Sequence, residues 1–416
     1  MIKLKMPQNF FDYTIERLLS FQRQIQELLG SDFPFADTVD VLKTIDEIFK
    51  AERERVLSLK ENSPEIQKSA CSNANLKIQK FLPLLGFILR STNVRNAFEL
   101  TDPLVRLSRS LLKKEINFIL SSEWDFSPLT YTFSFKELPR AILLGLPTFE
   151  SGNALIIPLA GHELGHWIWR DENVDSQLSA LLQGNVIQVF RDRWEDYQKI
   201  FGENQVEKIE SDLFIRSVWT ISFADALRQC EEIFADFVGL KLFGSSYLDS
   251  FEYLLAPSMG EPRSREYPNM RTRARILERA AKSFGVTVPP GYPDHFDELT
   301  ETREPADQFL IQASDAATEQ TVVEIEKHVV ALSERLKFPI LSPTETNRCV
   351  DRMKMGIPAE NTTFIANVIN AGWIIFKDET LLPEAALGME RRISVLNQLL
   401  LKTIEVSEFE ARMRGE

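Results

Sequence analysis

The chain has 416 residues, of which 44% are hydrophobic and 26% are charged, and its formal net charge at pH 7 is −13. This composition is ordinary for a globular protein, and the length allows two or three packed units or one large domain. The acidic balance argues against a nucleic-acid backbone or an anionic membrane surface as the main partner. It gives no information about a substrate.

The cysteines and the apolar runs limit the class of protein further. Cys71, Cys230 and Cys349 are scattered and form no CxxC pair, so neither a disulfide framework nor a thiolate zinc site is expected. The first residues, MIKLKMPQNFFDY, lack the apolar stretch of a signal peptide. The longest apolar runs fall short of the ~20 residues that a membrane span needs. We therefore expect a cytoplasmic protein without a membrane span.

The first 120 residues are expected to be helical, because apolar residues recur there at the spacing of one helix face. The segments with this spacing are 8–30, 36–61, 63–91 and 100–120. The pattern then changes to LTYTFSF at 129–135, where aromatic residues stand at every second position and indicate a strand. A second short strand is expected at 140–146.

The remainder of the chain is expected to be helical, with loops where proline and glycine gather. Pro158 fits the first turn of a helix at about 156–170, because its missing N–H needs no partner there. Ser342 and Glu345 match a capping box at the start of a helix that Gly356 ends. Further helices are expected over 175–201, 208–243, 269–284, 306–336, 362–376 and 383–413. The predicted fold class is mainly α with a small β-sheet (α+β).

The sequence HELGH at 162–166 carries the clearest chemical signal, and it holds two of the four histidines of the chain. Residues four apart lie on one helix face, so His162 and His166 can offer two nitrogens to one ion at the ~2.0–2.1 Å that zinc prefers. Glu163 lies about 100° round the helix, within reach of a water on the metal. Its expected role is general base.

The alternative interpretation of HELGH is an ordinary core helix whose histidines bond to buried acceptors. The preceding run LIIPLAG is strongly apolar, and burying a His-Glu-His face directly after it is costly unless those groups have a function. Gly165 also favours the metal site, because a small residue inside the helix lets another backbone or a substrate approach closely.

A catalytic zinc site needs a third protein ligand and one open position. Glu172 stands where the HExxHxxGxxH arrangement has its third ligand, but Trp169 replaces the glycine that turns that chain back to the metal. Glu232, in the segment CEEIFADFVG, is the better candidate, because it shares a helix face with Asp236. Asp236 can accept the free N–H of a ligating imidazole. Glu231 is expected to point elsewhere.

HELGH together with EIFAD resembles the gluzincin metallopeptidases, in which the third zinc ligand is a Glu from an ExxxD helix. The ADxxG ending and the later RARIL are similar to the CAAX prenyl protease family and its bacterial HtpX-like relatives, over about residues 129–284. The resemblance implies one zinc ion per chain and a β-strand, here 140–146, that binds the substrate backbone by strand addition. The residues to which it assigns roles are His162, His166 and Glu232 as ligands, Glu163 as base, and Asp236 behind the ligands.

The chain departs from that family in two respects. No membrane-spanning helices are expected, so the family's lipidated or membrane-protein substrates are not implied. Where many members have His-Pro before an Arg-Ile helix, this chain has Tyr267 followed by proline. The Tyr267 hydroxyl, or as second choice the Arg273 guanidinium, is expected to donate to the oxyanion of the tetrahedral intermediate. The competing interpretation is that Tyr267 anchors a loop and that the arginines form a solvated face. His295 and His328 have no expected role.

These expectations divide the chain into an N-terminal helical region (1–120), a zincin-like metallopeptidase core (121–287) and a C-terminal helical region (288–416). The expected function is zinc-dependent hydrolysis of a protein or peptide substrate, by a water that Glu163 activates. The helical regions would select substrates or bind a regulatory protein partner, and no nucleic-acid partner is expected. The alternative is a catalytically latent or non-enzymatic protein, in which the helical regions act as a partner-binding scaffold.

Overall fold

The computed structural model describes residues 9–33, 36–92, 98–112, 115–123, 129–130, 138, 141–150, 152–257, 263–297, 303–382 and 388–415. Most of these residues are helical, and one three-stranded sheet accompanies the helices. The expected fold class, mainly α with a small β-sheet, is therefore confirmed. No helix in this part of the chain is both long enough and apolar enough to cross a membrane.

The chain packs as two compact units. Residues Met1–Phe98 and Lys114–Ser151 form the first unit, and residues Glu99–Lys113 and Gly152–Glu416 form the second. The three regions expected from the sequence do not coincide with these units. The strands pack with the N-terminal helices, whereas the C-terminal helices pack in the same unit as the HELGH helix.

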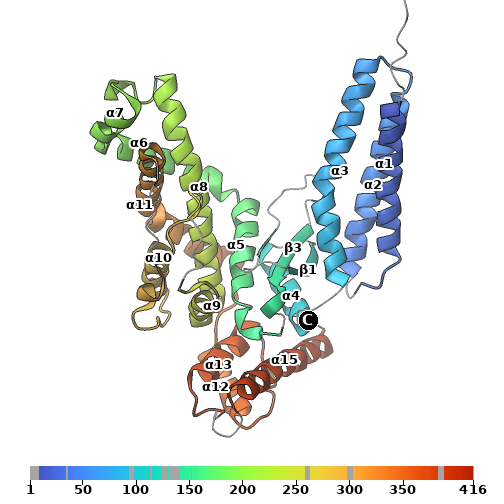
Figure 1. Cartoon of the computed structure of the whole chain (residues 1–416). Helices are drawn as coiled ribbons and strands as arrows, with labels where there is room; N and C mark the ends of the chain where they lie inside the picture. The colour runs from blue at the N-terminus through green and yellow to red at the C-terminus, as the bar shows by residue number, and fades with distance from the viewer. Residues whose placement is uncertain are drawn as a thin grey trace, which may run out of the picture. The chain divides into compact units, whose positions relative to one another are not determined.

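The first unit contains three long helices that lie side by side, drawn in blue in Figure 1. They are α1 (Asn9–Leu29), α2 (Ala36–Ser58) and α3 (Pro64–Thr92). Each helix buries one apolar stripe against the other two, as the helical spacing of its apolar residues predicts. Phe49 of α2 lies in the middle of this core, with its ring centre 4.3 Å from that of Phe21 and 5.2 Å from that of Phe81.

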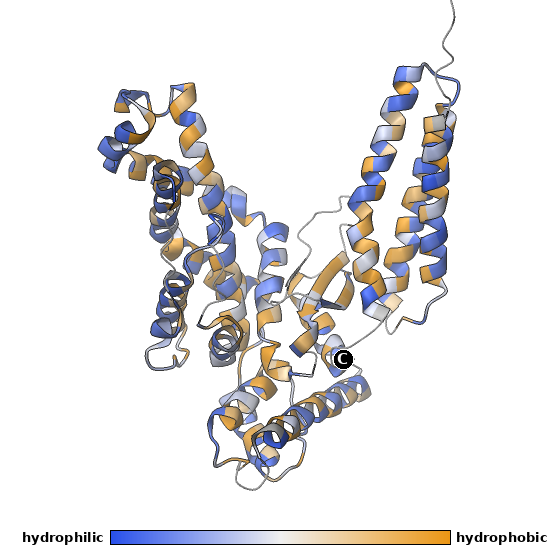
Figure 2. Ribbon diagram, viewed as in Figure 1, coloured by the Kyte–Doolittle hydropathy of each residue, from blue (hydrophilic) through white to orange (hydrophobic). Residues whose placement is uncertain are grey.

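The sheet of the first unit has the order β1-β3-β2. Its strands are β1 (Asn117–Glu123), β2 (Leu129–Thr130) and β3 (Ala141–Pro147). β3 runs parallel to β1 and antiparallel to β2, and Figure 2 shows β1 and β3 as predominantly hydrophobic ribbons. A strand that is buried on both faces reads as a continuous apolar run, and AILLGLP in β3 has this character.

The segments that form this sheet were expected to include the end of a helix and two strands. The helix expected to continue to residue 120 is wrong over 117–120, because 117–123 form β1. A short apolar run does not distinguish a strand from a helix by spacing. The expected strand 140–146 is confirmed as β3, but it is the central strand, paired with β1 along its whole described length. It therefore has no free edge on that side for a substrate strand. Of the expected strand 129–135, residues 131–135 lie outside the described part.

The second unit is helical. It contains α4 (Thr101–Leu112), α5 (Leu159–Asp171), α6 (Val174–Asp192), α7 (Trp194–Phe201), α8 (Leu213–Phe243), α9 (Ser245–Leu255), α10 (Met270–Ser283), α11 (Pro305–Leu336), α12 (Pro343–Lys354), α13 (Ile365–Lys377) and α15 (Met389–Arg414). The two most extensive helix contacts in this unit are those of α8 with α5 and with α11, and α8 also packs against α6. Every residue from 229 to 240 of α8 is buried, which makes this stretch a central core helix.

The helix ends agree with the sequence at most positions and differ at a few. Gly244, at φ 61°, ends α8, and the chain turns at once into α9, a helix that the sequence pattern did not indicate. Pro158 was expected in the first turn of α5, but it takes the N-cap position, one residue before the helix begins at Leu159. Ser342 accepts the backbone N–H of Glu345 at 3.2 Å, as the capping box predicts. The backbone N–H of Ser342 donates to Asn367 Oδ1 at 2.9 Å and not to Glu345, so the reciprocal half of the capping box does not form.

The packing of α5 on α8 depends on Gly165. A Cβ built on Gly165 would lie 2.5 Å from the Cα of Ala235, and one built on Gly161 would lie 3.1 Å from the Cα of Gly239. Real Cβ atoms do not show a separation as short as 2.5 Å, and the Cα of Ala235 belongs to backbone that cannot move aside cheaply. A Cβ on Gly161 would also meet the ring of Phe243, at 2.9 Å. The two helix backbones therefore approach as closely as glycine permits.

Replacing Gly165 with alanine is expected to lower the free energy of unfolding by about 1–3 kcal/mol, because the added methyl group overpacks the helix contact. Gly184→Ala in α6 is the matched control, since nothing lies within 4 Å of a Cβ at that position. That second substitution is expected to raise the stability by about 0.5–1 kcal/mol, because alanine favours the helix over glycine. Urea unfolding followed by circular dichroism measures both; effects of the same sign would contradict the close approach.

Candidate metal centre

Two antiparallel helices of the second unit supply the residues of the candidate metal centre. α5 carries HELGH and α8 carries CEEIFAD. His162 contacts Asp236, whereas His166, one turn further along α5, contacts Glu231, which precedes Asp236 in α8. Residues later in α5 therefore face residues earlier in α8, and the two motifs meet at the Gly165 contact.

Three donor atoms converge at this contact. The Nε2 atoms of His162 and His166 lie 3.1 Å apart, and they lie 3.3 Å and 3.6 Å from the two carboxylate oxygens of Glu232. Two ligands at the ~2.0–2.1 Å bond length of a tetrahedral zinc ion are separated by about 3.4 Å. Each of these separations is thus close to the edge length of such a tetrahedron, with the two imidazoles approaching different oxygens of Glu232. Within the described residues, this is the one group of His, Cys, Asp or Glu that could hold a metal ion.

Asp236 fixes the orientation of the His162 ring. The Nδ1 of His162 donates to Asp236 Oδ1 at 2.9 Å, which leaves Nε2 to face the other donor atoms. The same carboxylate accepts from the Tyr247 hydroxyl at 2.6 Å and from the Arg273 guanidinium at 2.7 Å. All four side chains are largely or fully buried. A metal-binding histidine requires an acceptor for the N–H on its other ring nitrogen, and Asp236 is placed as such an acceptor for His162.

Glu231 has the corresponding position behind His166, so the expectation that it points elsewhere is wrong. The Nδ1 of His166 donates to Glu231 Oε1 at 2.9 Å, and the Arg228 guanidinium donates to the second oxygen of the same carboxylate. The helical pattern suggested no role for Glu231 because it has no acidic residue four positions on. The relevant signal is the second histidine, since each ligating imidazole needs an acceptor for its other N–H.

The charges of the centre control the protonation of its residues. Burial alone would lower the pKa of His162, but the hydrogen bonds and charges of Asp236 and Glu232 raise it to about 10. Burial would raise the pKa of Glu232, but the hydrogen bond from His162 and the charges of His166, His162 and Arg273 lower it to about 2. The protein therefore offers Glu232 as a carboxylate, and a metal ion competes with a proton for His162.

Glu163 lies beside the three donor atoms and is buried, with 7% of its surface exposed. Burial raises the pKa of its carboxyl group, which the charges of His162 and His166 partly offset. In contrast to Glu231, Glu232 and Asp236, Glu163 makes no hydrogen bond or ion pair within the described part of the chain. Its carboxylate is thus near the centre and has its hydrogen-bonding capacity unused.

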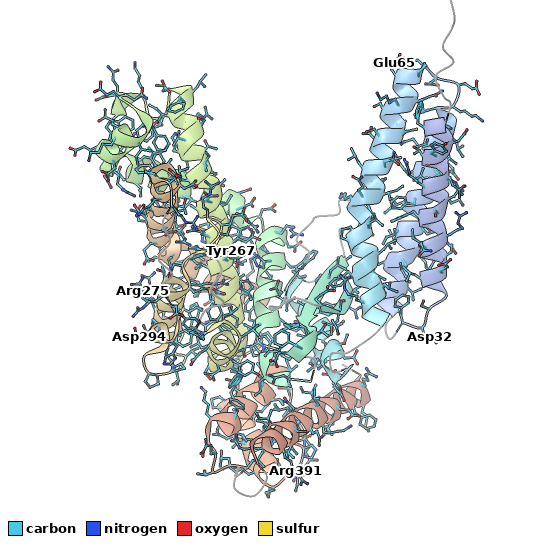
Figure 3. All side chains as sticks on the ribbon, viewed as in Figure 1. Asp32, Glu65, Tyr267, Arg275, Asp294 and Arg391 are labelled. Atoms are coloured by element: carbon cyan, nitrogen blue, oxygen red, sulfur yellow. The ribbon has the colours of Figure 1, made fainter. Side chains whose placement is uncertain are left out.

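The two candidate oxyanion donors have different environments. The charge of Glu232, then burial, and also the charge of Glu163 raise the pKa of the Tyr267 hydroxyl, while the charges of Arg273 and Arg228 lower it. The segment of Tyr267 packs on α8, because Gln229 of α8 donates to the carbonyl of Arg265 at 2.9 Å. Figure 3 labels Tyr267. The backbone carbonyl of Tyr267 accepts from Arg263 at 2.7 Å. The residue therefore does anchor its loop, but through its backbone and not through the phenol.

Arg273 is buried, with 7% of its surface exposed, so it is not part of a solvated face. Its guanidinium binds Asp236 through two N–H groups and lies 5.1 Å from the centre of the Phe251 ring. It also lies 3.4 Å from the Glu232 carboxylate. Arg273 therefore lies at the centre, and its donors are directed at the carboxylates of Asp236 and Glu232.

The remaining candidates lie away from the three donor atoms. The Glu172 carboxylate accepts from Arg335 of α11, which removes it as a third ligand. His295 pairs with Glu252 at 2.8 Å on a partly exposed surface. His328 makes its hydrogen bond to a backbone carbonyl one turn earlier in α11. Of the residues that the structure describes, only His162, His166 and Glu232 direct ligand atoms at one point.

No described protein family, no curated protein and no solved structure matches this chain. The assignment of the centre therefore rests on its own residues. The sequence supplied His162, Glu163, His166, Glu232 and Asp236 by helical spacing. It did not supply Tyr247, because that residue lies in α9, whose position beside Asp236 depends on the turn at Gly244.

The purified protein is expected to contain about one zinc ion per chain. Glu232→Gln removes a ligand. Loss of a hydrogen-bond partner behind a ligand weakens metal binding by about 10–100-fold, and we expect Glu232→Gln to weaken zinc binding by more than that. Glu172→Gln is the control and is expected to bind zinc as the wild type does, because Arg335 holds that carboxylate. Chelator competition and elemental analysis measure both variants. Loss of zinc in Glu172→Gln but not in Glu232→Gln would reverse the assignment.

Proposed function

We propose that the protein is a zinc-dependent metallopeptidase that hydrolyses peptide bonds in a protein or peptide substrate. The observation that carries this proposal is the Glu163 carboxylate, which is buried beside the three candidate ligands and has no hydrogen bond in the described structure. A purely structural metal site has four protein ligands and needs no base. A site with three ligands and an adjacent unpaired carboxylate suits hydrolysis.

A zinc ion bound by His162, His166 and Glu232 would supply Lewis acidity and would lower the pKa of a coordinated water to about 7. Glu163 would then take the proton of the attacking water and transfer it to the leaving amine. Its raised pKa, caused by burial, suits this role, because a general base works best when its pKa approaches the working pH. Asp236 and Glu231 hold the two imidazoles in the tautomer that presents Nε2.

Of the two oxyanion donors, the geometry favours Tyr267. Its hydroxyl makes no hydrogen bond among the described residues, and the charges of Glu232 and Glu163 act on it. The Arg273 guanidinium is bound to Asp236, and a donor that left this carboxylate would leave a buried charge unpaired. We therefore assign the oxyanion contact to Tyr267, and we assign to Arg273 the positioning of Asp236 and, through it, of His162.

The resemblance of HELGH and EIFAD to the gluzincin motifs supports the same proposal, since it implies the same ligands and base. The competing possibility is a latent protein whose helices bind a partner and whose metal centre performs no reaction. The unused carboxylate of Glu163 argues against this alternative, because a relic has no reason to keep a base that costs burial energy.

Glu163→Gln is expected to abolish peptide hydrolysis and to leave the zinc content near one ion per chain, because it removes the base and keeps the shape and the ligands. The measurement compares new protein N-termini in a cell extract incubated with the wild type and with the variant, alongside elemental analysis of both proteins. New cut sites that depend on Glu163 would support the proposal. Full activity of the variant would refute the mechanism, and zinc binding without any cut site would favour the latent protein.

Tyr267→Phe is expected to lower kcat by about 10²–10³-fold without loss of zinc, because one donor to the developing negative charge is removed. Tyr253→Phe is the matched control: Tyr253 is 43% exposed, as Tyr267 is, and it packs on Trp373 away from the donor atoms. Steady-state kinetics on a peptide identified from the cut sites measure both variants. Equal kcat values for the two would assign the oxyanion contact to another group.

A further inference from the structure

The face of α5 that carries Glu163 and His166 continues to the C-terminal end of the helix through Trp167 and Arg170. The guanidinium carbon of Arg170 lies 4.7 Å from the centre of the Trp167 ring, and both side chains are half-buried. Within the described residues, no carbonyl or carboxylate accepts a hydrogen bond from Arg170. A half-buried guanidinium with five donors therefore has a ring on one side and no acceptor.

Arg228 faces this end of α5, because the helices are antiparallel and Arg228 lies one turn before Glu231. It donates to Glu231, the acceptor of His166. Burial lowers the pKa of Arg170, the charge of Glu231 raises it, and the charge of Arg228 lowers it again, so both groups lie close to Arg170. The carboxylate of Glu231 is thus already bound to Arg228, and the charges of Arg170, Arg228 and Glu231 sum to one unit of excess positive charge.

We propose that Arg170, Trp167 and Arg228 form a subsite that binds a carboxylate of the substrate beside the metal centre. This inference rests on the proposed peptidase function and gives it a substrate class. A carboxylate matches the planar donors of a guanidinium, and stacking on Trp167 holds the Arg170 side chain in place before the substrate binds. One excess positive charge balances one carboxylate, whereas a phosphate group would bring about two negative charges.

The helix geometry limits where this carboxylate lies in the substrate. Arg170 follows His166 by four residues, which corresponds to ~6 Å along the helix axis and to about two residues of an extended peptide. The carboxylate is therefore either the side chain of an Asp or Glu about two residues from the cleaved bond, or the C-terminal carboxylate of a peptide cut about two residues from its end.

Two degenerate decapeptide libraries distinguish these sources. Both are N-acetylated, and one ends in an amide whereas the other ends in a free acid. The zinc-loaded protein is incubated with each, and mass spectrometry identifies the cut sites. Enrichment of Asp or Glu about two residues from the cut in the amide library identifies an acidic side chain. Cuts near the C-terminus in the free-acid library alone identify the terminal carboxylate.

Arg170→Gln tests the subsite, because Arg228 also supports Glu231 and its loss would disturb His166. The ratio of kcat/KM for an acidic peptide to that for its Asn or amide counterpart is expected to fall about tenfold, the effect of one charge-assisted hydrogen bond. Arg170→Lys is expected to restore part of this ratio. Arg191→Gln, in an exposed pair with Glu210 on α6, is the control and is expected to keep the wild-type ratio.

The outcomes separate this inference from the proposed function. Cleavage without a carboxylate preference, or a preference that Arg170→Gln retains, would overturn the subsite and keep the peptidase. If no peptide is cut, binding of an Asp-containing and an Asn-containing peptide pool to zinc-loaded Glu163→Gln is measured by tryptophan fluorescence. Tighter binding of the Asp pool that Arg170→Gln abolishes would support the subsite although hydrolysis fails. Equal binding of the two pools, together with equal binding of a free-acid and an amide pool, would overturn the subsite as well.

Discussion

The contact between α5 and α8 at Gly165 and Ala235 is the constraint on which the centre depends. Histidine and glutamate side chains are short, so they reach a common point only if the two helix backbones are close together. Glycine at 165 permits this approach, and the separations of 3.1, 3.3 and 3.6 Å between the donor atoms follow from it. Any widening of the helix pair would move Glu232 away from both imidazoles at once.

The charges buried around this contact explain why a divalent cation suits the centre. Arg228 and Glu231 compensate one another, and Arg273 compensates one of the three remaining carboxylates, Glu163, Glu232 and Asp236. With neutral imidazoles, two negative charges remain in a region where unpaired charge is costly. A proton on His162 offsets one of them without a metal, in accord with its raised pKa. A divalent cation would offset both. The positive charge of Arg170 is not needed to compensate any of these carboxylates.

The residues of the centre were predictable where they depend on local spacing. His162 and His166 in α5, and Glu232 and Asp236 in α8, are each four apart on one helix, so the geometry within each pair follows from the helix itself. Glu231 was missed because its role depends on the position of α5 relative to α8. Tyr247 was missed because α9 was not expected.

The fold shows the same division between local and long-range information. The long helices α1, α2, α3 and α11 were predicted to within a few residues, because each has a long apolar face. The sequence predicts helix over the first residues of β1, because a segment of seven residues is too short for its apolar spacing to distinguish a strand from a helix. The two compact units were not predictable either. The strands pack with the N-terminal helices through contacts between segments far apart in sequence, which no local pattern encodes.

The polar groups around the centre fall into two sets: those that bond to one another, and those that have no protein partner in the described structure. Asp236, Arg273 and Tyr247 are buried and bonded to one another, so their donors and acceptors are already used. The carboxylate of Glu163 and the phenol of Tyr267, by contrast, make no hydrogen bonds in the described structure. Polar groups near a catalytic centre that have no protein partner are the groups available to a substrate. Under the proposed function, a peptide would therefore approach along the Glu163 face of α5, which is the face that leads on to Trp167 and Arg170.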